Sequence, residues 1–196
     1  MESGSVGPAW RKLFELLSDV CRQEDADSML ETVMREITEV VPLDHGMALH
    51  EIREGVPYCT RWPDYADDLV PAFNAYYNKR CPIRYDWCSH MLGPVSWKRF
   101  RDSEYDAEFN RPMRLGHSVG LGWMDPVSRR EIVLVMHRSR GRVSFSEQDA
   151  RNLILFRPLF SRVYSLSREV EALRREIYDP AELIKGADML SRREAE

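Results

Sequence analysis

The strongest constraint on the fold is a long amphipathic segment near the C-terminal end of the chain. Its apolar residues alternate between spacings of three and four, and they are Phe156, Leu159, Val163, Leu166, Val170, Leu173 and Ile177. This heptad pattern predicts one long helix with a narrow apolar seam, which requires a partner helix. Phe145 and Ser146 mark its start, because a serine followed three residues later by Asp149 can satisfy the first free backbone amides of a helix.

The later half of this seam is expected to bind a second subunit. Its members are Val163, Leu166, Val170, Leu173 and Ile177. Arginine and glutamate residues between positions 168 and 176 surround them, which favours an exposed coiled coil between two copies of the chain. The alternative is packing on the sheet of the same domain, which we expect for the earlier half of the seam. We therefore predict a homodimer.

The overall composition is that of one globular domain with an appendage. The chain has 196 residues, of which 43% are hydrophobic and 10% aromatic, enough to build a core. The sequence holds neither a run of 18 apolar residues nor a secretory leader, so we expect a cytoplasmic protein without a membrane partner. A net charge of −4 argues against direct nucleic-acid binding by this stretch. The four cysteines lack CxxC spacing and are expected to be free thiols: Cys21, Cys59, Cys81 and Cys88.

Two amphipathic helices are predicted before the first strand. The first begins after Pro8, and its apolar positions are Trp10, Leu13, Phe14, Leu17, Val20 and Cys21. The second begins near Asp25 or Asp27 and ends at Pro42, which cannot donate the next helical hydrogen bond. Its apolar positions are Leu30, Val33, Met34, Ile37, Val40 and Val41. Both helices therefore need a shared apolar surface to pack on.

A β-sheet is the predicted surface. Residues 45–52 and 56–62 are two extended runs joined by Glu54-Gly55, a pattern typical of a hairpin. Residues 119–123 alternate large and small, and residues 132–136 form an unbroken apolar run suited to a central strand. Helices beside an antiparallel sheet, with a long insertion between its strands, predict an α+β fold.

The insertion between the two pairs of strands, residues 63–116, is unusually aromatic. Residues 58 to 109 hold twelve of the chain's twenty aromatic side chains. Such rings, with a polar group at one edge, commonly line small-molecule pockets because they cover a ligand and also orient it. The alternative is that they only fill the space between short helices and the sheet.

The last residues resemble the start of a DNA-binding module. The segment Leu190–Glu196 is similar to the first turn of the LuxR-type helix-turn-helix, and Ser191 with Glu194 has the spacing of a capping box. The resemblance implies a sensor domain over residues 1–178, followed over 179–196 by a linker and the first residues of the helix-turn-helix. DNA contact would then be made by residues beyond 196. The alternative is a frayed charged tail.

The upstream part resembles the sensor half of LuxR-type regulators with a GAF-like domain. The stretches that carry the likeness are 73–77 with Cys81-Pro82, 103–112, 115–121, 145–149 and 157–160. They match a Tyr-Tyr pair near an Asp-Pro step, an acidic aromatic helix leading into a glycine-bearing strand, and an Arg-Pro-His-Leu step on the final helix. The resemblance implies a GAF-like antiparallel sheet with flanking helices and a long C-terminal helix. It also implies a sensor that binds a small-molecule effector and controls DNA binding.

The expected ligand-binding residues come from the aromatic insertion and its neighbours. They are Tyr58, Trp62, Tyr65, Tyr77, Trp97 and Trp123. The first three are similar to Trp and Tyr positions of acyl-homoserine-lactone sensors. Those sensors have an aspartate before the proline, where this chain has Cys81 before Pro82, and a thiol is a poor substitute for a carboxylate acceptor. An ordinary lactone signal is therefore not expected. Phe160 stands where the family often has histidine.

Catalytic and metal sites are not expected. The histidines form no HExxH pair, and His45 and His50 have an odd separation that would place them on opposite faces of a strand. No nucleophile elbow or phosphate-binding loop occurs in the sequence, so we expect no enzyme activity, cofactor or metal. The basic run Arg138–Arg142 is interpreted as a solvated turn.

Two further functions remain open at this point. Cys81 and Cys88 lie seven residues apart in the insertion, and they would form a redox sensor if they oxidised together. The domain could also be a dimerisation module with a collapsed interior that binds no ligand.

Overall fold

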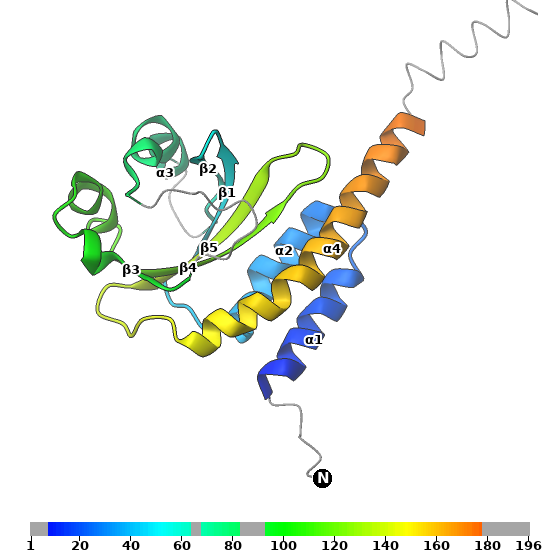
Figure 1. Ribbon diagram of the computed structural model, residues 1–196, viewed down its shortest axis with the longest axis horizontal. Helices are drawn as coiled ribbons and strands as arrows, with labels where there is room; N and C mark the ends of the chain where they lie inside the picture. Colours follow the sequence, from blue (N-terminus) through cyan, green and yellow to red (C-terminus); the bar gives the residue numbers. More distant parts are fainter. Residues whose placement is uncertain (1–7, 64–67, 83–92, 178–196) are drawn as a thin grey trace, which may run out of the picture.

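The computed structural model describes residues 8–63, 68–82 and 93–177 (Figure 1). Its centre is a five-stranded antiparallel sheet with strand order β2-β1-β5-β4-β3. The strands are β1 (Met47–Arg53), β2 (Val56–Arg61), β3 (Val95–Ser96), β4 (Leu115–Met124) and β5 (Glu131–Ser139). The predicted α+β class is confirmed, while the short edge strand β3 was not predicted.

The predicted β1–β2 hairpin is confirmed. Glu54 and Gly55 form its turn with φ angles of 52° and 75°. Positive φ at both central residues is the geometry of the tight turns that match the twist of antiparallel strands, and glycine adopts it without a steric cost.

Three helices cover one face of the sheet (Figure 1). They are α1 (Pro8–Cys21), α2 (Ala26–Glu36), which continues into a 3-10 turn (Ile37–Glu39), and α4 (Glu147–Ile177). Alternate residues of β4 and β5, such as Leu121 and Leu134, are fully buried against these helices. Trp123 lies in this core, with its ring 5.0 Å from that of Phe160 and 5.6 Å from that of Tyr164.

Polar contacts anchor α4 to the rest of the domain. Ser146 and Asp149 form the expected reciprocal cap, since each accepts a hydrogen bond from the other's backbone N–H. At the other end, the Glu171 carboxylate accepts a hydrogen bond of 2.6 Å from the N–H of Ala26, at the start of α2. That amide is one of the donors that a helix cannot satisfy internally. The position of α4 is therefore set by contacts near both of its ends.

Short helical segments occupy the opposite face of the sheet. They are α3 (Leu69–Ala72), a π-helical turn (Phe73–Tyr77), two 3-10 turns (Asn78–Arg80 and Trp97–Phe100) and a second π-helical turn (Asp106–Asn110). They carry the aromatic insertion, so one sheet separates two layers of different composition. The helix-covered face holds the larger apolar core, and the other face holds the aromatic side chains.

Gly116 lies at an irregularity in the pairing of β4 with β5, where any larger residue would clash. A Cβ atom there would lie 2.6 Å from the Ser139 carbonyl oxygen and 2.7 Å from the Arg140 Cα. Because both neighbours are backbone atoms, we expect Gly116→Ala to lower the free energy of unfolding by about 1 to 3 kcal/mol. Urea denaturation would measure this. Gly93→Ala is the control, since a Cβ at Gly93 meets nothing within 4 Å; equal losses in both variants would contradict the prediction.

Candidate functional site

The aromatic cluster is the main candidate site. Its members are Trp62, Phe73, Tyr77, Trp97, Tyr105 and Phe109. Phe109 is central, because its ring centroid lies 4.9 Å from that of Tyr77, 5.2 Å from that of Tyr105 and 5.4 Å from that of Phe73. These side chains come from the end of β2 and from three short helical segments, and they meet on the sheet face opposite α1, α2 and α4.

Buried polar side chains from the three central strands lie under this cluster. His50 on β1, Ser118 on β4 and His137 on β5 are 0 to 4% exposed. The Trp97 indole Nε1 donates to Ser118 Oγ over 2.7 Å, and the same oxygen lies 2.8 Å from His137 Nδ1. The Trp62 ring stacks on the His137 imidazole with centroids 5.7 Å apart. Hydrogen bonds thus connect Trp97 to Ser118 on β4 and Ser118 to His137 on β5, and His137 in turn contacts the Trp62 ring.

The titratable groups beneath the cluster are neutral near pH 7. Burial lowers the pKa of His50 to about 4. Burial, with smaller repulsions from His50 and His45, lowers the pKa of His137 to about 3. Burial also raises the pKa of the Cys59 thiol to about 12, so this side chain stays protonated. The surface that these residues present to the aromatic cluster is therefore polar but uncharged.

Three of the six expected ligand-binding residues lie together in this cluster: Trp62, Tyr77 and Trp97. Tyr65 lies outside the described residues. Tyr58 does not face the cluster, because its neighbour Cys59 does and side chains alternate along a strand. Its ring packs under the Arg53 guanidinium instead, 4.9 Å from centroid to carbon.

Trp123 lies apart from the other expected ligand-binding residues for a similar reason. Trp123 and Ser118 are five residues apart on β4, an odd separation that places them on opposite faces of the strand. Trp123 consequently packs against α4 in the apolar core. The density of aromatic residues along the sequence did not distinguish those that pack in this core from those that lie on the insertion side of the sheet.

The sequence analysis missed His50, Ser118 and His137. Each is a polar residue beside apolar residues of a central strand, and such a residue is buried at a cost unless a partner is present. The position of these polar residues within predicted strands could therefore have marked them in the sequence. Their meeting under one aromatic cluster required the strand order, which places β5 between β1 and β4.

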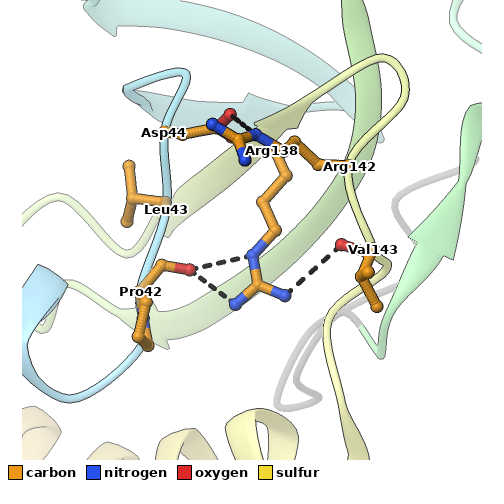
Figure 2. Close-up of a pocket in the computed structure, with 6 residues that line it drawn as sticks. All are labelled: Pro42, Leu43, Asp44, Arg138, Arg142 and Val143. Carbon is orange, nitrogen blue, oxygen red and sulfur yellow. Dashed lines mark hydrogen bonds and ion pairs between the residues drawn. The ribbon is translucent and has the colours of Figure 1, made fainter.

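A pocket lies at the surface, between the loop before β1 and the loop after β5 (Figure 2). Arg138 points into it, but its guanidinium donates to the Pro42 carbonyl at 2.6 and 2.9 Å and to the Ser144 carbonyl at 3.0 Å. Arg142 is paired with Asp44 over 2.9 Å. Because its basic groups already have partners, this pocket joins two loops and is a weak candidate for ligand binding.

The basic run Arg138–Arg142, which begins at the end of β5, is not the solvated turn that was expected. Arg138 pairs with Asp149 at 3.3 Å, at the start of α4. Arg140 pairs with Asp106 at 2.6 Å, in the π-helical turn that also carries Phe109. Asp106 is fully buried and has a second partner in Arg111 at 3.2 Å. The end of β5 thus links the aromatic cluster on one face to α4 on the other.

The later part of the α4 seam is exposed. Leu166 is 56% exposed, Leu173 55% and Ile177 63%, while Val163 packs partly on the core. Exposed apolar side chains continue toward the start of α4 and onto α1, and they include Trp10, Phe14, Leu155 and Leu159. Scattered apolar residues are common on surfaces, but a continuous stripe of this length indicates an interaction surface.

Metal ligands, disulfides and membrane-spanning helices can be assessed only for the described parts of the chain. Residues 8–63, 68–82 and 93–177 contain no group of three His, Cys, Asp or Glu side chains placed to hold a metal. Among them, Cys21, Cys59 and Cys81 form no disulfide, while Cys88 lies outside these ranges together with the tail 179–196. In the same ranges, no helix has the length and apolar character needed to cross a membrane.

Several solved structures share this architecture. The chain matches the ligand-binding domain of VqsR from Pseudomonas aeruginosa with a TM-score of 0.56 and 18% identity, over 83% of this chain and 97% of that one. It matches the phycoerythrobilin-bound GAF domain of a cyanobacterial phytochrome with a TM-score of 0.54 and 12% identity, over 86% and 100%. The fold is therefore GAF-like, as predicted.

A third similar structure is the N-acylhomoserine-lactone-dependent LuxR-family transcription factor CepR2 from Burkholderia cenocepacia. The TM-score is 0.55 and the identity 14%, over 84% of this chain and 99% of that one. No protein-family model matches the sequence, and no curated protein matches it significantly. The likeness to LuxR-type sensor domains is one of three-dimensional structure.

Proposed function

We propose that this chain is the signal-sensing domain of a LuxR-type transcriptional regulator, and that it binds a small molecule at the aromatic cluster. The observation that carries the proposal is an uncharged aromatic cluster over buried, incompletely paired polar groups, on the sheet face that α1, α2 and α4 leave free. Its fold is shared with a lactone-dependent regulator and with a GAF domain that holds a bilin. Both likenesses favour sensing over catalysis.

The proposed response is a shift between two arrangements of α4. A ligand that contacts Phe109 acts on the turn that carries Asp106, and Asp106 is tied to Arg140. Arg138, two residues before Arg140, forms an ion pair with Asp149 at the start of α4. A ligand that binds one arrangement of this linkage more tightly increases its population, and with it one geometry of α4.

The exposed seam on α4 is proposed to form a homodimer. Two α4 helices, one from each copy, would bury the stripe from Val163 to Ile177 against each other. Trp10 and Phe14 of α1 lie beside Leu155 and Leu159, so the interface would extend onto α1. A dimer suits a regulator that binds DNA sites with two-fold symmetry.

Native mass spectrometry of protein purified from its host tests the sensing proposal. We expect a co-purified small molecule, observed as a discrete added mass on a species that carries two chains. A protein that reproducibly carries no added mass, and whose Trp fluorescence does not respond to a metabolite library, would instead support the ligand-free dimerisation module.

Substitution of Trp62 is expected to weaken ligand binding. Trp62 contacts both His50 and His137, so Trp62→Ala removes the ring that would stack on a bound molecule. We expect about tenfold to hundredfold weaker retention of the co-purified compound, the range seen when a buried aromatic contact is truncated. Trp62→Phe should retain part of it. Tyr58→Ala is the matched control, because Tyr58 faces away from the cluster; equal losses in the Tyr58 and Trp62 variants would contradict this placement.

A further inference from the structure

We infer that the sensed molecule is an uncharged compound with a planar ring and an acceptor oxygen, such as a ketone or ester carbonyl, which receives the Nε2–H of His137. The inference rests on the proposed sensing function and specifies the chemistry of its ligand. It follows from the hydrogen bonds of Ser118, from the burial of His137 and from the charges around the cluster.

The Ser118 hydroxyl determines which nitrogen of His137 carries the proton. The Trp97 indole can only donate, so Ser118 Oγ accepts that hydrogen bond. The hydroxyl proton of Ser118 then needs an acceptor, and within the described part of the chain its available partner is His137 Nδ1 at 2.8 Å. Because Nδ1 accepts, the proton of the neutral imidazole resides on Nε2. Trp97 and Ser118 thus make His137 Nε2 a donor.

This donor is buried and has no hydrogen-bond partner among residues 8–63, 68–82 and 93–177. His137 is 4% exposed, and its Nε2 is among the buried nitrogen atoms without a hydrogen bond. A buried donor that lacks a partner destabilises a protein by about 1 to 3 kcal/mol, so nearly all such groups are paired with protein, water or ligand. The Trp62 ring stacked on this imidazole places the unpaired N–H beside an aromatic face. A ligand oxygen at this position would complete the hydrogen-bonded chain.

The electrostatics of the cluster disfavour a charged ligand. The His50 and His137 imidazoles are neutral at pH 7, so neither offers an ion pair to a carboxylate or phosphate. The guanidinium groups of Arg111 and Arg140, which reach the turn that carries Phe109, are both paired with Asp106. An ammonium group would likewise find a carboxylate that already has two partners. From the charged groups that the structure describes around the cluster, a charged molecule would gain no counter-charge in return for its lost hydration.

Four probes of similar size separate these properties: acetophenone, isopropylbenzene, benzoate and benzylamine. Binding of each to the purified chain would be measured by ligand-observed NMR titration. We expect acetophenone to bind about tenfold more tightly than isopropylbenzene, because the two differ chiefly in the acceptor oxygen. Benzoate and benzylamine should bind more weakly than acetophenone.

Two variants test the assignment to His137. His137→Phe should reduce the preference for acetophenone over isopropylbenzene to about one. Ser118→Ala should reduce it severalfold, because the imidazole proton is no longer held on Nε2; this variant also tests the assignment should His137→Phe fail to fold. His117→Phe is the matched control, since His117 is a buried histidine on β4 whose side chain points to the face opposite Ser118.

The outcomes separate this inference from the proposed function. Equal binding of acetophenone and isopropylbenzene, tightest binding of benzoate or benzylamine, or an unchanged preference in His137→Phe would overturn the inference while leaving small-molecule binding intact. Binding of none of the four probes would overturn the inference and count against the aromatic cluster as a sensing site.

Discussion

The protein is expected to lose stability steeply in mild acid, by roughly 2 to 3 kcal/mol of unfolding free energy for each pH unit between pH 6.5 and pH 5. The cause is the burial of His50 and His137, which lowers their pKa values from 6.5 to about 4 and about 3. In this interval the unfolded chain binds protons on both imidazoles and the folded chain does not. Stability is therefore complete above pH 6.5 and decreases as the pH falls toward the folded pKa values.

Urea denaturation at half-unit pH intervals would measure this slope. Above pH 5 the carboxylates contribute little, because their pKa values in unfolded chains are near 4. His117, whose pKa burial also lowers, adds a smaller term in the same direction. The His50→Phe and His137→Phe variants should each remove about half of the slope. A wild-type protein whose stability is flat between pH 6.5 and pH 5 would show that these imidazoles are hydrated or already charged in the folded state.

Leu166→Asp is expected to convert the dimer to monomers. Leu166 lies in the middle of the exposed seam, and two copies of the substitution would bury two carboxylates against apolar side chains. We expect the dimer dissociation constant to rise roughly a thousandfold, because each subunit would lose about 2 kcal/mol of binding free energy. Sedimentation equilibrium would measure this directly, and the circular dichroism spectrum should not change.

Arg175→Asp provides the control for this effect. Nine residues at 100° each place Arg175 on the opposite side of α4 from Leu166, and both side chains are exposed. This variant should remain dimeric with a dissociation constant near that of the wild type. A Leu166→Asp protein that stays dimeric at micromolar concentration would exclude the seam as the interface.

Local sequence signals predicted most of the fold because the features concerned are themselves local. Glu54-Gly55 turns the hairpin and the Ser146–Asp149 pair starts α4, both as expected, and Asp25, one of the two predicted starts of α2, caps that helix. The amphipathic pattern of α1 was less informative. Trp10 and Phe14 are exposed, whereas Leu16, absent from the predicted apolar face, is buried. A helix that packs on two neighbours buries a different arc from one that packs on a single surface.

The candidate site could be predicted only in part, since it depends on which strands are neighbours. Aromatic density identified the insertion, and Trp62, Tyr77 and Trp97 do meet there. Tyr58 and Trp123 were misplaced because the face on which a side chain lies follows from strand phase. Both faces of β4 are buried, so the sequence of that strand does not reveal which face Trp123 occupies. His50 and His137 lie 87 residues apart in the numbering, and the pairing of β1 with β5 brings their strands together.

The contact between Glu171 and the first amide of α2 restricts how α4 can move. A shift of α4 along its own axis by one helical turn, about 5.4 Å, would remove the carboxylate from the Ala26 N–H and separate Arg168 from Asp125. A tilt that pivots near Glu171 preserves both contacts while it displaces the C-terminal end of α4, which extends past the sheet in Figure 1. In the proposed dimer, a change of crossing angle between the two α4 helices would therefore keep these contacts, whereas a translation along the helix axis would break them.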